Sequence, residues 1–131
     1  LLYRDTKKKI KLYPIAINSE LTTAIGNDIS FKKIFSENLE IYGEKNDSII
    51  LLSCSGNSDN IIEIAKFAKK NGIKIYSITG FNGGKLCKIS DFNINIKSDN
   101  YGIIEDIQSS IFHIISQSIR LKFTKKKIKY L

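Results

Sequence analysis

The sequence predicts an α/β protein in which helices flank an open parallel sheet. From Leu12 to Leu121, short apolar runs alternate with segments of helical periodicity. The run DSIILLS (47–53) lacks the polar alternation of a strand with one solvent-facing side, so we expect it to be buried on both faces. Alternating strands and helices are typical of one sheet built with right-handed crossovers.

The elements can be placed in order along the chain. Strands are expected at 12–18, 47–53, 72–79 and 91–97, where apolar residues cluster. Helices are expected at 30–42, 58–72 and 101–123, with a loop and short helical turn within 81–90. The second helix is amphipathic, with Ser58 as its candidate N-cap and Asn-Gly at its end.

Length and composition predict a single domain over residues 1–131, with its core at 12–121. The 131 residues are 42% hydrophobic, but no window is long and apolar enough to span a membrane, and the first residues lack the order of a signal peptide. We expect a cytoplasmic protein with no membrane partner. Cys54 and Cys87 are too few for a disulfide scaffold.

The net charge of +8 comes from the two ends of the chain. Lysines concentrate in the basic end segments, residues 1–11 and 122–131, and the residues between them are close to neutral. Charge placed this way is more typical of solvated ends than of a nucleic-acid groove. We therefore expect no nucleic-acid partner, with direct DNA binding as the third-ranked alternative.

The sharpest chemical feature is the loop Ser53-Cys54-Ser55-Gly56-Asn57-Ser58, between a predicted strand and a predicted helix. Ligands of open parallel sheets bind at the carboxyl ends of the strands, and a helix N-terminus attracts anions. Three hydroxyls around a glycine are suited to phosphate. An ordinary serine-rich turn with Ser58 as N-cap explains the spacing equally well. Neither GxxxxGK[ST] nor GxGxxG occurs, so we expect no nucleotide cofactor.

Two motifs resemble a known family. SCSGNSDNIIEIAKFAKKNGIKIYSITGFNGGKL is similar to the sugar isomerase (SIS) domain, in its phosphoheptose isomerase branch, which carries S-T-S-G-N-S and T-G-x-x-G-G-K-L. Upstream, LTTAIGNDISFKKIFSENLE resembles that branch's L-T-A-I-G-N-D segment. Over residues 12–121 the resemblance implies a flavodoxin-like three-layer sandwich with a five-stranded parallel sheet. It also implies a tetramer with shared active sites.

The resemblance implies a reaction and a set of contacts. The reaction would convert sedoheptulose 7-phosphate to D-glycero-D-manno-heptose 7-phosphate, for the heptose of lipopolysaccharide or capsule. Asp28 would contact substrate hydroxyls, although an Asx turn or a cap explains it equally well from the residues alone. Cys54 replaces the branch's threonine, and a thiol is a weaker donor. The phosphate would be contacted by Ser53, Cys54, Ser55, Gly56, Asn57 and Ser58.

The only histidine, His113, lies within the predicted helix 101–123. Considered alone, a histidine among apolar residues is more often a core residue than a catalyst. The resemblance implies instead that His113 is catalytic, as a proton shuttle. Glu105 stands where the branch has glutamine, and the resemblance implies that it would contact the substrate or, with His113, hold a divalent metal such as zinc. The helix is apolar nearly all round, so we expect a second partner for it, in a homo-oligomer.

The branch's G-N-G-G-S segment, and the helix with its catalytic glutamate, would precede Leu12. We therefore expect the N-terminal part of the domain to be missing, either because the chain is a fragment or because it is a natural short form that cannot complete the site. Two non-catalytic alternatives remain open: a phosphosugar-binding regulator, and an adaptor of a replication initiator.

Overall fold

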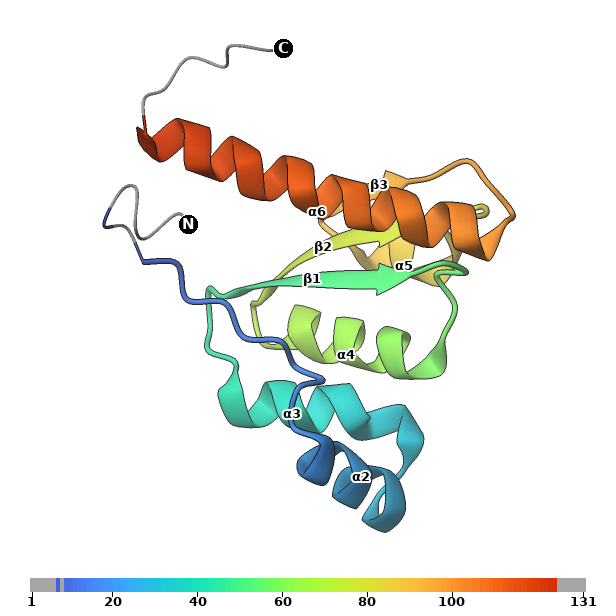
Figure 1. The fold of residues 1–131 in the computed structure, drawn as a ribbon. Coiled ribbons are helices and arrows are strands. Elements are labelled where there is room, and N and C mark those ends of the chain that lie inside the picture. The colour runs from blue at the N-terminus through green and yellow to red at the C-terminus, as the bar shows by residue number, and fades with distance from the viewer. Residues whose placement is uncertain (1–6, 8, 125–131) are drawn as a thin grey trace.

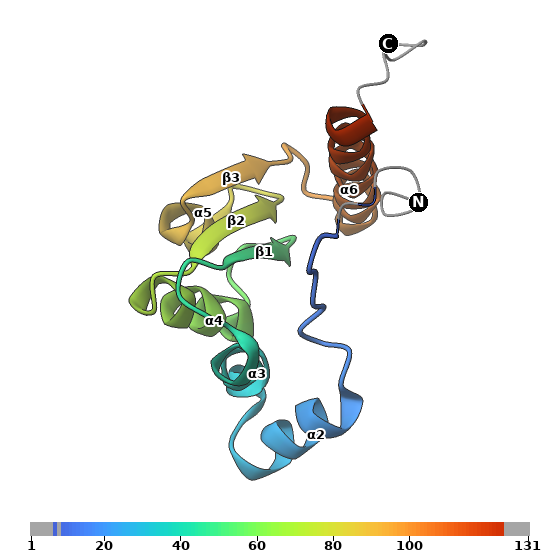
Figure 2. The same cartoon turned by 90° about the vertical axis from the view of Figure 1, so that its left-hand side faces the viewer.

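The structure is a computed structural model that describes residue 7 and residues 9–124. Much of the two basic end segments therefore lies outside the described residues. The described chain has three layers, in which α4 and α5 cover one face of a sheet and α6 lies on the other side (Figures 1 and 2). Helices α2 and α3 continue outward beyond α4. The predicted α/β class with a parallel, helix-flanked sheet is confirmed.

The sheet is parallel and has the order β1-β2-β3. Its strands are β1 (Ser48–Ser53), β2 (Lys74–Thr79) and β3 (Phe92–Asn95). Ser53 at the end of β1 pairs with Thr79 at the end of β2. The loops that follow these two strands therefore leave the sheet side by side, as the carboxyl ends of parallel neighbours must.

Apart from the first, the helices agree closely with the predicted ranges. They are α2 (Ser19–Asp28), the 3-10 turn η1 (Phe31–Lys33), α3 (Ile34–Tyr42), α4 (Asp59–Lys70), α5 (Gly84–Ile89) and α6 (Tyr101–Thr124). The apolar face of α4 packs on β1 and β2, where Ala65 and Ala68 are fully buried. Within the described residues, no helix combines the length and apolar character needed to cross a bilayer.

The strand predicted at 12–18 was wrong, and the described residues form three strands where the resemblance implied five. Pro14 has no N–H to donate to a ladder, and its carbonyl accepts a bond from the N–H of Ile17, which bends the chain into a turn. In Figure 2 this blue segment passes between α6 and α2 without joining the sheet. Helix α2, which was not predicted, then starts at Asn18, whose side chain accepts from the N–H of Leu21.

The expectation that β1 is buried on both faces was also wrong for the described chain. Its side chains alternate between exposed and buried along the strand. Ile50 and Leu52 are each 39% exposed, on the face opposite α4. An apolar run does not by itself require two covered faces. Here α6 covers the face of Ile50 and Leu52 only in part.

Helix α6 docks on the sheet through its first half. Ile104 is fully buried, and a Cβ on Gly80 would overlap its side chain, so glycine at position 80 makes room for the helix. The buried Gln108 donates from Nε2 to the carbonyl of Ile78 at 3.2 Å. These contacts fix the start of α6 beside the carboxyl ends of the strands.

The loops after β1 and β2 touch through their glycine backbones. Gly56 has a φ of +65°, and a Cβ there would overlap the carbonyl oxygen of Gly83. The N–H of Leu86 donates to the carbonyl of Gly56 at 2.9 Å, and the N–H of Gly80 donates to the carbonyl of Cys54 at 2.8 Å. The loops that resemble the family's S-T-S-G-N-S and T-G-x-x-G-G-K-L therefore form a single backbone unit.

We predict that Gly56→Ala destabilises the protein far more than Gly72→Ala. Both glycines have positive φ, but a Cβ at Gly72 would meet nothing closer than Lys45 Cγ at 3.6 Å. Gly72→Ala should cost only about 1 kcal/mol of left-handed backbone strain. Gly56→Ala should cost at least about 2 kcal/mol more, because the two loops must separate. Urea denaturation measures both; equal losses would contradict the backbone contact.

Candidate functional site

The loop of residues 53–58 joins the end of β1 to the start of α4 and is held by its own hydrogen bonds. The N–H of Gly56 donates to Ser53 Oγ at 3.1 Å, and Ser53 is buried. The N–H of Asn57 donates to Ser55 Oγ at 3.2 Å, and Asn57 Nδ2 donates to the carbonyl of Ser55 at 3.1 Å. The hydroxyl of Ser53, at the end of β1, thus holds the loop in place through the N–H of Gly56.

Asn57 also links this loop to the next one. Its Oδ1 accepts the backbone N–H of Lys85 in the first turn of α5, at 3.1 Å. The second loop is held from β3, because Asn95 Nδ2 donates to the carbonyl of Gly80 at 2.9 Å and to Thr79 Oγ1 at 3.1 Å. Hydrogen bonds to α5, β2 and β3 consequently hold the backbones of both loops in place without a ligand.

Ser58 occupies the N-cap position of α4, but its side chain makes no capping hydrogen bond. The first N–H groups of a helix have no acceptor within the helix, and the positive end of the dipole lies there. Ser58 is exposed, so its hydroxyl and these N–H groups can reach a ligand together. The simple alternative, in which Ser58 serves as an ordinary side-chain cap, is not what the structure shows.

Two open hollows of the surface, called pockets here, include residues of this loop or of the first turn of α4. The first is lined by Ser55, Asn57, Phe81 and Asn82, so it joins the loop to the residues that follow Gly80. Ser55 and Asn57 were predicted from sequence. Phe81 and Asn82 were missed, although their place directly after β2, at the same sheet edge, was a signal that could have found them.

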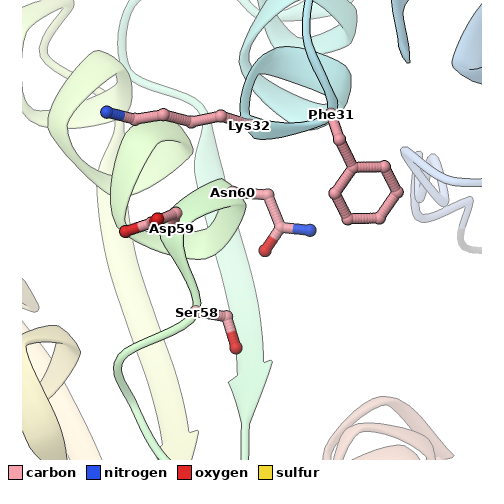
Figure 3. A pocket seen from close by; sticks show the side chains of 5 residues that line it. All are labelled: Phe31, Lys32, Ser58, Asp59 and Asn60. Carbon is pink, nitrogen blue, oxygen red and sulfur yellow. The ribbon is translucent and has the colours of Figure 1, made fainter.

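The second pocket is lined by Phe31, Lys32, Ser58, Asp59 and Asn60. In Figure 3 the side chains of Ser58, Asn60 and Phe31 point to one side of the first turn of α4, whereas those of Asp59 and Lys32 point to the other. Lys32 Nζ is paired with Glu63 Oε2 at 3.5 Å. The side shared by Ser58 and Asn60 therefore presents neutral donors and a ring.

Cys54 points away from both pockets, toward α6. Its Sγ lies 4.0 Å from Glu105 Oε1, and it packs beside the buried Ile78, Ile96 and Ile104. Burial raises the pKa of the Cys54 thiol, and the Glu105 carboxylate raises it further. The thiol is thus kept protonated and donates weakly to the carboxylate. The structure brings together the two positions, 54 and 105, at which the sequence departs from the family pattern.

His113 and Asp28 are not brought to the loop by the described contacts. His113 is exposed on α6, about two turns beyond Glu105. Asp28 ends α2, accepts from Asn27 Nδ2 at 2.8 Å, and is exposed. It lies just before the turn that supplies Phe31 to the second pocket. Their predicted roles stay predictions.

The predicted metal site, Glu105 with His113, does not form a complete donor set here. Among the described residues, no three His, Cys, Asp or Glu side chains are placed to hold a metal ion. Zinc in proteins takes three or four protein ligands. Glu105 has Cys54 as its neighbour instead, so the described residues do not fit such an ion, and no chemical step is assigned to one.

Comparison with known proteins identifies what this chain is similar to. Residues 6–80 match the family described as SIS domain. A phosphoheptose isomerase of Helicobacter pylori is 32% identical over 124 residues, covering 95% of this chain and 65% of that protein. A probable phosphoheptose isomerase of Thermoplasma acidophilum is 34% identical, covering 92% of this chain and 66% of that protein.

The fold comparison agrees with the sequence comparison. The structure of a phosphoheptose isomerase from Neisseria gonorrhoeae superposes with a TM-score of 0.83 at 26% identity, covering 90% of this chain and 66% of that one. The chain thus spans about two thirds of the length of these relatives, slightly less in each case.

We predict that Glu105→Gln speeds alkylation of Cys54 at alkaline pH. Removing the carboxylate lowers the Cys54 pKa, although burial still holds it above the ordinary value, so more thiolate is present at a given pH. In a Cys87→Ser background, the rate with iodoacetamide near pH 8.5 should rise. Asp106→Asn, one residue along α6, is the control and should leave the rate unchanged. A rate unaffected by Glu105→Gln would show that the two side chains do not interact.

Proposed function

The chain belongs to the SIS domain family, as its two loop motifs predicted, and from that premise we propose that it is a cytoplasmic phosphosugar isomerase. Its substrate would be sedoheptulose 7-phosphate and its product D-glycero-D-manno-heptose 7-phosphate. The relatives that match most of this chain are named phosphoheptose isomerases, which supports this reaction. The heptose would serve lipopolysaccharide or capsule synthesis.

The loop at the start of α4 carries this proposal. A phosphate placed there would meet the hydroxyls of Ser55 and Ser58 and the first N–H groups of α4, except that of Ile61, which already donates to Asn60 Oδ1 at 2.9 Å. The twelve residues of α4 contribute a dipole whose positive end faces the anion. Because the Ser58 side chain makes no capping hydrogen bond, its hydroxyl can donate to the phosphate. Ser53 supports the loop and would not contact the phosphate as directly.

Aldose–ketose isomerisation moves a proton between adjacent carbons through an enediol. The bound phosphate fixes the register of the sugar, and a base and an acid must then reach its first two carbons. His113 is the residue we assign to proton transfer, since an imidazole can both accept and donate near neutral pH. Asp28 would accept hydrogen bonds from sugar hydroxyls. Glu105 would add a negative charge to this side of the site, beside the neutral thiol of Cys54.

We predict that replacing both Ser55 and Ser58 by alanine removes most of the affinity for sedoheptulose 7-phosphate. Each hydrogen bond to a charged phosphate contributes about 1.5–3 kcal/mol, so the double variant should bind at least about a hundredfold more weakly in calorimetry. Ser118→Ala, an exposed serine in the far half of α6, is the matched control. Unchanged affinity in the double variant would remove the phosphate site from the loop.

Catalysis is tested separately from binding. His113→Gln should lose isomerase turnover of sedoheptulose 7-phosphate while its dissociation constant for this sugar stays the same. If the unaltered protein binds the sugar phosphate but shows no turnover, the phosphosugar-binding regulator becomes the better account. If it binds none, the loop has no phosphosugar function.

We also infer that the protein assembles with copies of itself, as a tetramer. Several large apolar side chains of α6 are exposed in the single chain: Ile103, Ile107, Phe112 and Ile114. A second copy would bury them. Light scattering at micromolar concentration should give four subunits, and Ile107→Glu should reduce that number whereas Ser109→Glu should not. A monomer would contradict the inference.

A further inference from the structure

Phe81 lines the first pocket, and its backbone has an uncommon conformation. Its φ is +47°, a left-handed conformation that favours glycine or asparagine and is rare for a bulky side chain. The backbone of Phe81 is held by a hydrogen bond, because its N–H donates to the carbonyl of Ser98 at 2.8 Å. The fold therefore maintains a phenylalanine at a position where a smaller residue would be less strained.

Neighbouring groups fix the direction of the ring. The ring of Tyr101, at the start of α6, meets the Phe81 ring edge-on, with centroids 5.2 Å apart and planes at 63°. The Phe81 side chain also packs against the small cluster of Ile78, Ile96 and Ile104. An edge-to-face pair and a buried cluster hold the side chain of Phe81 in place, and Phe81 is one of the residues that line the pocket.

The pocket wall combines two kinds of chemistry. Ser55, Asn57 and Asn82 supply hydroxyl and amide groups, and Phe81 supplies the aromatic surface. A sugar phosphate has the matching halves: an anion with hydroxyls, and a carbon chain whose C–H bonds are attracted to the electron-rich face of a ring. Inorganic phosphate has only the first half.

We propose that Phe81 is a specificity-determining residue that receives the carbon skeleton of the substrate while the loop of residues 53–58 holds its phosphate. This inference rests on the proposed function, because it assumes that a phosphosugar binds at that loop. It adds that the sugar extends into the first pocket, beside Phe81, and not into the second pocket, beside Phe31. Phe81 thereby separates sugar phosphates from free phosphate.

The test compares two probes, inorganic phosphate and sedoheptulose 7-phosphate, by calorimetry. Phe81→Leu keeps the apolar bulk and removes the aromatic face, so the dissociation constant for the sugar phosphate should rise about fivefold while that for inorganic phosphate stays within twofold. Phe81→Asn, which suits the left-handed backbone, should show the same selective loss and guards against misfolding. Phe81→Tyr should retain the affinity. Phe31→Leu, in the second pocket, should change neither constant.

Three results would overturn the inference. Equal losses for both probes in Phe81→Leu and Phe81→Asn would show that Phe81 only supports the phosphate loop. Unchanged constants for both probes would show that the ring does not meet the sugar. A selective loss in Phe31→Leu would place the sugar in the second pocket. If the unaltered protein binds neither probe, the proposed function itself fails, a result distinct from these three.

Discussion

The site depends on the close approach of two glycine-containing loops at one edge of the sheet. Parallel pairing of β1 with β2 brings the loops out side by side, and only glycine at position 56 allows its backbone to lie against Gly83. Other contacts add to this one: Asn57 bridges to α5, Gly80 admits Ile104 of α6, and Phe81 lines one pocket with Ser55. A side chain at the contact would push the two loops apart.

Most elements could be predicted because local signals and packing agreed. The amphipathic pattern of α4 and the apolar run of β1 predicted their positions to within a residue or two. The prediction of a strand at 12–18 was wrong because it rested on composition alone. Pro14 bends the chain there, and the segment has no pairing strand among the described residues. Helix α2 was missed because its signal was a single cap, Asn18.

The site was predictable in part, for a physical reason. The loop of residues 53–58 is local in sequence, so its hydroxyls could be identified from spacing. Phe81 and Phe31 approach it from other elements, and their distance from the loop depends on tertiary packing that no short motif encodes. The same limit applies to Cys54 and Glu105, which stand where the resembled family has threonine and glutamine. They are 51 positions apart in the sequence, and only the fold brings them into contact.

The most direct measurement of the central claim is an amide chemical-shift titration with inorganic phosphate, followed by NMR. If the loop at the start of α4 is the phosphate site, the largest changes should fall on the N–H groups of residues 55–60, with smaller ones at 81–84 through the glycine contact. Changes confined to the lysine-rich segments 1–11 and 122–131 would instead indicate non-specific attraction to their charge and would contradict the account.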